Sequence, residues 1–405
     1  FVYMNKIRDI ILNTKVPLVL KDFPVNWECF DGSLWDWCTR FDKDASEMPT
    51  FESMAIADCE TPQWERKRKR IDMSMEYFLN EYSKRDENRK SKSEWAAYQY
   101  KRADELPPSC AHGIDFKRFG FPEHDNDYSL WLGSKHANTP CHYDTYGINI
   151  VVQVYGSKSW LLFPPETPLK STRIPYEESS VYCLENFYAP APNKLGHYEQ
   201  FHGQAYHCLL YPGDVLIVPR HWWHYVEAEE MSLSVNYWVP LKTDLDFTLD
   251  ELIVKHVIES FVKGESEQLK KYLLNPNQLE EIAEKASTLF SLFESAVHNQ
   301  TTDSKRQLWD IEYMNQNEVS KIISSIGIRV RALDVMQKDA YMLLLQNNSR
   351  RHAAPKAESL TTDTSLDTNV ISSTLELLIN SMCAPRCIAG VKRELFRRLG
   401  HSEDL

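Results

Sequence analysis

The stretch INIVVQVYGSKSWLLF, residues 148–163, decides the fold class. Its first half, Ile148 to Tyr155, is rich in β-branched residues, and Lys158 to Phe163 is again apolar and aromatic. Such residues favour strands, and the intervening Gly156-Ser157 is a dipeptide that can form a tight turn. The stretch therefore predicts two strands joined as a hairpin.

Further strand signals follow later in the chain. Pro212-Gly213-Asp214 predicts a turn, the apolar residues Val215 to Val218 come next, and Met231 to Trp238 alternates as a half-buried strand does. Short strands separated by turns over about a hundred residues indicate a barrel or jelly roll. We therefore expect a mainly β protein with added helices, whose β core spans residues 121–240.

Two clusters of metal-ligand residues lie within this β region. His142 and Asp144 are two positions apart, so on a strand both side chains point to one face. The segment His221 to His224 offers further imidazoles, and a jelly roll would bring His142 and His224 together at its mouth. Two imidazoles and one carboxylate, with coordination positions left open, are the ligand set of non-heme Fe(II) oxygenases. Because His-x-Asp arises readily by chance in a chain with 13 His, a hydrogen-bonded polar pair is the alternative.

Composition narrows the class of protein. The chain has 405 residues, 42% hydrophobic and 26% charged, which is typical of a globular protein with one large domain and room for a second. No apolar run approaches the roughly 18 residues of a membrane span, and the start lacks a secretory signal, so we expect a cytosolic or nuclear protein. Nine cysteines, scattered singly, predict reduced thiols. The net charge of -12 argues against a nucleic-acid partner.

The rest of the chain divides into four further parts. Residues 1–120 mix short apolar stretches with a Trp-rich patch, which predicts helices and short strands beside the core. Residues 241–346 change to a helical period, with apolar stripes at Val254 to Val262 and at Leu279 to Val297. The polar residues 347–369 predict a flexible linker, and residues 370–405 predict a final helical segment. The stripes predict either packing within the protein or a homodimer through the C-terminal helices.

A run of five basic residues, Arg66 to Arg70, stands out against the acidic background. Such a run is typical of a nuclear-import signal or of a patch that binds an acidic partner. The simpler interpretation is a solvated loop or helix face.

The motifs of the β region, taken in order, resemble a known family, the JmjC (cupin-type) Fe(II)/2-oxoglutarate oxygenases. The likeness covers roughly Pro17 to Pro240 and is carried by these segments: Leu130 to Gly133, Thr139 to Asp144, Asn149, Gly156 to Pro165, Pro212 to Val215, Val218-Pro219, Trp222 to His224 and Val235 to Trp238. The resemblance implies a double-stranded β-helix, the jelly-roll fold of cupins, as the JmjC core, with a C-terminal helical region after it.

The resemblance also assigns roles to individual residues. It implies Fe(II) held by His142, Asp144 and His224, with 2-oxoglutarate and O2 as cosubstrates. His202, His207 and His221 are competitors for the third position, and His224 is preferred because Trp222-Trp223-His224 after the Val215 to Pro219 strand matches the family. Lys158 would bind the distal carboxylate of 2-oxoglutarate, because a cation inside a barrel needs an anionic partner. The alternative is a solvent-facing Lys158 after the turn. The remaining cosubstrate contacts implied by the family are Thr139, Asn149, Asn236 and a tyrosine that is either Tyr98 or Tyr100.

The activity that the resemblance implies is oxidation of a C-H bond coupled to decarboxylation of 2-oxoglutarate. Oxidation of an N-methyl carbon leads to demethylation, and oxidation of a side-chain carbon leads to stable hydroxylation. We favour hydroxylation of a protein side chain, because the chain lacks the clustered Cys and His spacings of chromatin-reader zinc modules. Lysine demethylation, RNA hydroxylation and a non-catalytic scaffold that binds a small heat-shock protein are the alternatives. We expect the choice of substrate to depend on the pocket rim and loops, where specificity in such enzymes lies.

Overall fold

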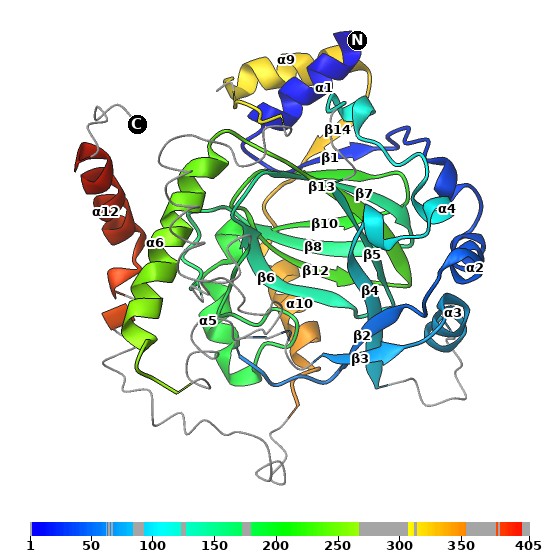
Figure 1. Ribbon diagram of the computed structural model, residues 1–405, viewed down its shortest axis with the longest axis horizontal. Coiled ribbons are helices and arrows are strands. Elements are labelled where there is room, and N and C mark those ends of the chain that lie inside the picture. The colour runs from blue at the N-terminus through cyan, green and yellow to red at the C-terminus, as the bar shows by residue number, and fades with distance from the viewer. Residues whose placement is uncertain are drawn as a thin grey trace.

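Two antiparallel β-sheets face each other at the centre of the molecule (Figure 1). The computed structural model describes residues 2–61, 63, 65, 68–83, 93–122, 127–171, 180–266, 307–311, 314–353, 378–379 and 381–398. Within these residues the larger sheet has nine strands, in the spatial order β14 (Arg329–Ala332), β1 (Leu18–Lys21), β11 (Val215–Val218), β7 (Ile148–Tyr155), β13 (Ser232–Val239), β5 (Tyr128–Gly133), β4 (Glu94–Arg102), β2 (Thr50–Ala55) and β3 (Lys69–Asp72). The smaller sheet has five, in the order β10 (Tyr206–Leu210), β8 (Lys158–Phe163), β12 (Trp223–Ala228), β6 (Asn138–Asp144) and β9 (Ser180–Tyr182).

This arrangement confirms the predicted mainly β, jelly-roll class and corrects one of its details. The strands predicted at 148–155 and 158–163 are β7 and β8, but they do not pair as a hairpin. Strand β7 pairs with β11 and β13 in the large sheet, whereas β8 pairs with β10 and β12 in the small one. The Gly-Ser dipeptide thus takes the chain from one sheet to the other. A turn signal shows where the chain bends, and does not show which strand each side will pair with.

Gly156 is required at this crossover. Its φ is +62°, a left-handed conformation that costs little only for glycine. A Cβ added there would lie 2.0 Å from the carbonyl oxygen of Met231, which leads into β13. A side chain at residue 156 would therefore collide with the backbone that leads into β13.

Helices cover the ends and outer faces of the two sheets (Figure 1). Helices α1 and α9 contact each other, as do α6 and α12. Helices α2, α3 and α4 lie at the side of the large sheet formed by β2, β3 and β4. Their bounds are α1 Val2–Asn13, α2 Leu34–Asp44, α3 Met75–Tyr82, α4 Pro108–Ala111, α5 Leu195–Glu199, α6 Asp244–Val262, α9 Gln316–Ile326, α10 Lys338–Ser349 and α12 Pro385–Arg398. None of the described helices combines the length and the apolar character of a membrane span.

The helical stripe predicted at Val254 to Val262 forms part of α6. Val254, Ile258 and Val262 are buried in a cluster with Ile379, Cys383 and Ile388 of the C-terminal segment. The stripe is therefore used for packing within the chain. The second stripe, Leu279 to Val297, lies outside the described residues.

Two features after residue 300 differ from expectation. Strand β14 lies within the range predicted as helical, and it adds to the large sheet by pairing with β1. Helix α10 runs to Ser349, inside the stretch predicted as linker, and its residue Asn348 is buried. A polar composition cannot distinguish a solvated asparagine from one whose hydrogen bonds are made inside the protein. Residues 354–369 of that stretch lie outside the described residues.

The basic run is neither a solvated face nor a free patch at its centre. The guanidinium of Arg68 is buried, lies 2.9 Å from a carboxylate oxygen of Glu52 and 2.8 Å from one of Glu65, and donates to the carbonyl oxygen of Asn138. The neighbouring Lys69 is exposed. Buried charges need paired partners, and of these partners only Glu65 is near Arg68 in the sequence, whereas Glu52 lies on β2 and Asn138 on β6. Arg66 and Lys67 lie outside the described residues.

Candidate metal centre and cosubstrate cavity

Strands β6 and β12 bring two imidazoles and a carboxylate together. The two strands pair in antiparallel fashion with His142 opposite His224. Nε2 of His142 lies 3.7 Å from Oδ1 of Asp144, and Nε2 of His224 lies 3.9 Å from its Oδ2. One ligand atom from each of the three residues lies within 4.8 Å of the others, and all three side chains are buried. Among the described residues, this is the group of His, Cys, Asp and Glu side chains whose spacing suits a metal ion.

Both imidazoles are held with Nε2 facing the shared centre. Nδ1 of His142 lies 2.8 Å from the carbonyl oxygen of Pro140, and Nδ1 of His224 lies 2.8 Å from that of Trp222. A carbonyl oxygen can only accept, so each Nδ1 carries a hydrogen, and in the neutral ring Nε2 is the nitrogen that keeps a lone pair. Burial, together with the neighbouring His224, lowers the pKa of His142 to about 4. Neutral imidazoles with fixed tautomers are the form that binds a divalent metal.

The three competing histidines make other contacts. Nε2 of His221 lies 3.0 Å from the carbonyl oxygen of Thr145, and its ring packs at right angles on Phe247. Nε2 of His207 lies 2.9 Å from Oγ of Ser159, and Nδ1 of His202 lies 2.9 Å from a backbone oxygen of α5. The structure therefore places His224, and none of these three, beside His142 and Asp144.

A chain of hydrogen bonds orients the carboxylate of Asp144. Its Oδ2 accepts from Nε1 of Trp238 at 2.8 Å and from Nδ2 of Asn149 at 3.2 Å. Oδ1 of Asn149 accepts from Nδ2 of Asn236 at 2.9 Å, and Oδ1 of Asn236 accepts from Nε1 of Trp131 at 2.7 Å. The two asparagines line the cavity as the resemblance implied, and in addition they support the candidate metal ligand.

Lys158 points into the interior of the fold. Its Nζ donates to Oγ of Ser234 at 2.7 Å and lies 3.4 Å from the carbonyl oxygen of Trp131. No acidic side chain pairs with this amine among the described residues. Burial lowers the pKa of Lys158 to about 7. The alternative of a solvent-facing lysine after the turn is wrong.

The triad and Lys158 share one cavity of about 360 Å³ between the two sheets. Its lining includes Thr139, Asn149, Val151, Trp160 and Asn236. It also includes Tyr100, and the centroid of its ring lies 4.1 Å from the ring centroid of Trp131. Tyr98 is instead buried against Phe41 and Phe51 on the other side of β4. The choice left open between the two tyrosines therefore falls on Tyr100.

Three residues that form the hydrogen bonds described above were not predicted: Ser234, Trp238 and Trp131. Strand β13 places Ser234, Asn236 and Trp238 on one face, because side chains two positions apart point the same way. Applying that periodicity outward from Asn236 would have found Ser234 and Trp238. Trp131 needed the pairing of β5 with β13, which the sequence does not give.

Comparison with known proteins places the chain in a family. The profile of the cupin-like domain matches residues 5–241, more than half of the chain. The protein belongs to the cupin-like domain family, and the resemblance to JmjC proteins is confirmed.

The chain is also similar to individual proteins of known name. The chain is 46% identical over 168 residues to HSPB1-associated protein 1 of Bos taurus, covering 40% of this chain and 34% of that protein. It is 32% identical over 112 residues to Jumonji C domain-containing protein 5 of Drosophila melanogaster, covering 28% of this chain and 27% of that protein. The solved structure of E. coli ycfD aligns over 71% of this chain and 65% of its own, with 14% identity and a TM-score of 0.32. The chain spans half or less of the length of the curated relatives that it matches.

Proposed function

We propose that this protein is an Fe(II)- and 2-oxoglutarate-dependent dioxygenase that hydroxylates a protein side chain. The observation that carries the proposal is the meeting of two Nε2 lone pairs and one carboxylate in the cavity that also contains the amine of Lys158. A metal centre alone would suit many reactions. A buried cation in the same cavity points to an anionic cosubstrate.

His142, Asp144 and His224 would hold the metal. Nitrogen and carboxylate donors suit Fe(II), and three protein ligands leave positions for the cosubstrate and for O2. When bound, Fe(II) and 2-oxoglutarate together supply the oxidant for a C-H bond while the cosubstrate is decarboxylated. The protein's own contribution is to fix the two tautomers and to hold Asp144 through Trp238 and Asn149.

Lys158 would hold the distal carboxylate of 2-oxoglutarate, with Thr139 beside it in the cavity. The amine already has one hydroxyl partner in Ser234, and an ammonium can donate three hydrogen bonds. A carboxylate would satisfy the remaining donors and offset the cost of burying the charge. Asn149 and Asn236 line the same space and act mainly through Asp144.

The test is an aerobic assay of the full chain with Fe(II), 2-oxoglutarate and a cell extract. The expected result is succinate formation and a one-oxygen mass gain on a peptide of the extract. Asp144→Ala should abolish both, whereas Asp310→Ala, at an exposed carboxylate outside the cavity, should change neither. A wild-type chain that fails to bind 2-oxoglutarate in the presence of metal would contradict the proposal.

A second function is suggested by the names of the relatives, several of which are HSPB1-associated proteins. We infer that this chain also associates with a small heat-shock protein. Full-length protein should be captured by immobilised HSPB1, and Asp144→Ala should be captured equally if the association is independent of the metal. Absence of capture for the wild type would remove this proposal and leave the dioxygenase proposal untouched.

Assembly and location stay predictions. A homodimer through the C-terminal helices would need surfaces other than Val254, Ile258 and Val262, because these are buried within the chain. Light scattering at micromolar concentration distinguishes monomer from dimer. We also propose a cytoplasmic location, with a nuclear fraction as the alternative, and microscopy of the tagged protein would test it.

A further inference from the structure

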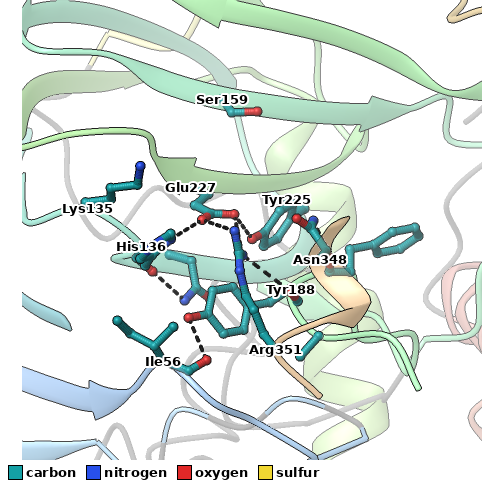
Figure 2. A network of polar contacts seen from close by, with 12 residues as sticks. Ile56, Lys135, His136, Ser159, Tyr188, Tyr225, Glu227, Asn348 and Arg351 are labelled. Carbon is teal, nitrogen blue, oxygen red and sulfur yellow. Dashed lines mark hydrogen bonds and ion pairs between the residues drawn. The ribbon is translucent and has the colours of Figure 1, made fainter. Parts of the chain in front are cut away.

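A partly buried ion pair joins the C-terminal part of the chain to a strand of the metal centre. Arg351 follows α10, and its guanidinium meets the carboxylate of Glu227 on β12 (Figure 2). The two nitrogen to oxygen distances are both 2.8 Å, one to each carboxylate oxygen. The Arg351 and Glu227 side chains are 18% and 5% exposed. Such a two-point contact fixes orientation as well as distance.

The same carboxylate binds two further groups. Oε2 of Glu227 accepts from the hydroxyl of Tyr225 at 2.7 Å, and Oε1 lies 2.9 Å from Nδ1 of His136 (Figure 2). His136 lies in the turn between β5 and β6 and has a φ of +73°. Glu227 therefore connects β12, the turn that leads into β6, and the segment after α10.

This network lies on the opposite face of β12 from the metal centre. His224 and Val226 line the cavity, whereas Tyr225 and Glu227 alternate with them and point outward. Tyr225, His136 and Arg351 therefore contact Glu227 on the strand that carries His224, but none of these contacts lies inside the cavity.

The backbone pairing beside the candidate ligands is irregular. His224 lies opposite His142 and Val226 lies opposite Thr139, so β6 contains one residue more than β12 between these two pairs. One of the residues in between is Pro140, which has no backbone N-H to donate. Where the ladder is interrupted, contacts from outside the strand pair have a larger share in setting its register.

The segment that contains Arg351 is itself firmly held. Tyr341 and Leu345 of α10 are fully buried in the cluster that contains Trp223 and Tyr225. Nδ2 of Asn348 donates to the carbonyl oxygen of Phe187 at 2.9 Å. The helix covers the outer side of the five-stranded sheet (Figure 1).

Backbone bonds continue this anchoring beyond the helix. The amide of Asp58 donates to the carbonyl oxygen of Arg351 at 2.9 Å, and that of Ala353 donates to the carbonyl oxygen of Asp58 at 2.8 Å. The guanidinium of Arg351 also lies 4.7 Å from the ring centre of Tyr188. Arg351 therefore presents its charge to Glu227 from a fixed position.

We propose that Arg351 is a positioning residue for the metal centre, acting through Glu227 to hold β12 against β6 and so His224 beside His142 and Asp144. Residues 338–353, which lie outside the matched domain at 5–241, are then part of the functional core. This inference uses the metal centre of the proposed function. It does not depend on which substrate is oxidised.

The test compares Arg351→Met with Arg350→Met in the full chain. The two arginines are adjacent, but Arg350 is exposed and its side chain is not part of the network. Titration with Co(II), followed by visible absorption, measures both affinity and ligand geometry. We expect Arg351→Met to weaken Co(II) binding by about tenfold or more and to alter the spectrum, as loss of an outer support typically does. Arg350→Met should match the wild type, and Arg351→Lys should restore part of the affinity.

Hydrogen exchange of the same variants without metal keeps the inference testable if the wild type binds no Co(II). Arg351→Met should speed exchange of the amides in residues 138–144 and 223–228, and Arg350→Met should not. If the wild type does not bind Co(II), that result contradicts the proposed function. The inference about Arg351 is then judged by the hydrogen-exchange result. If Arg351→Met does not fold, Glu227→Gln and Tyr225→Phe replace it in both measurements. The inference would be overturned if the folded variants exchanged these amides at the wild-type rate and bound Co(II) with the wild-type affinity.

Discussion

The indole Nε1 of Trp238 donates a 2.8 Å hydrogen bond to Oδ2 of Asp144. The two residues lie 94 positions apart, on strands of different sheets. The candidate metal ligand on the small sheet is thus oriented by a side chain of the large one. The cavity between the sheets is more than a space for ligands, because its opposite wall supports the triad.

Removing this bond should weaken the metal centre without emptying it. Trp238→Phe keeps an aromatic ring and loses the N-H, leaving Asp144 held by Asn149 alone. Loss of a group that orients a metal ligand typically costs about 10–100-fold in metal affinity, and we expect the lower end because one bond remains. Calorimetry with Mn(II) measures the change. Trp131→Phe, two hydrogen bonds further from Asp144, should have a smaller effect, and the reverse order would contradict the proposed relay.

The burial of Lys158 predicts a pH dependence for 2-oxoglutarate binding. Its pKa is lowered to about 7, and only the protonated amine attracts a carboxylate. Affinity in the presence of Mn(II) should therefore fall by about tenfold for each pH unit above the pKa. Calorimetry in buffers of different ionisation enthalpy should also detect proton uptake on binding. Lys158→Met should abolish tight binding, and Lys242→Met, at an exposed lysine, should not.

The same lysine predicts a pH dependence of stability. The pKa of Lys158 is about 7 in the folded protein and takes its ordinary value of 10.5 when unfolded. Between these two values the unfolded chain binds more protons, so this residue makes the free energy of unfolding rise with pH. Urea unfolding of wild type and Lys158→Met at about pH 7.5 and about pH 9.5 isolates the contribution. A wild type that loses stability relative to the variant as pH rises would show that the sign is wrong.

Arg68 should matter for stability far more than its neighbour in the basic run. Arg68→Met would remove the guanidinium that pairs with the buried carboxylate of Glu65, and breaking such a buried pair typically costs about 3–5 kcal/mol. Lys69→Met removes an exposed ion pair with Glu94 and should cost about 0–1 kcal/mol. The denaturation midpoints of the two variants give the comparison. Equal effects would mean that Arg68 is not buried as described.

Gly156 should tolerate no side chain. Gly156→Ala would force alanine into a left-handed conformation with its Cβ against the carbonyl oxygen of Met231, and should cost about 1–3 kcal/mol or more. Gly196→Ala is the matched control, because it lies in α5 with no atom within 4 Å of the new Cβ, and should stabilise slightly. Thermal unfolding of both variants tests the crossover between the sheets. An unchanged unfolding temperature for Gly156→Ala would contradict the close packing of this crossover.

Much of the core could be predicted from local patterns. The strands at 148–155, 158–163 and 215–218 follow from β-branched and apolar runs bounded by turn residues, and the helical period after residue 250 marks α6. His142 and Asp144 share a face because they are two positions apart on a strand. Each of these inferences depends on residues that are close together in the sequence.

The parts that could not be predicted depend on pairing between distant strands. The Gly-Ser turn did not show that β7 and β8 belong to different sheets. The polar residues at the end of α10 and just after it did not show that Asn348 is buried or that Arg351 pairs with Glu227. Likewise, Trp131 is recognised as part of this hydrogen-bond chain only once β5 pairs with β13 and places it beside Asn236.

The sequence by itself determined the strand segments, the His-x-Asp pair and the charged residue types from which a site is built, because these follow from the local periodicity of side chains. Motif order favoured His224 over His221, and the pairing of β6 with β12 shows how His224 comes to lie opposite His142. Only the tertiary structure decided that Tyr100 rather than Tyr98 lines the cavity. It also decided that Arg351 supports β12 from outside. The physical reason is that which face of a strand meets which neighbour depends on register and sheet assignment, and these are set by packing across the whole core.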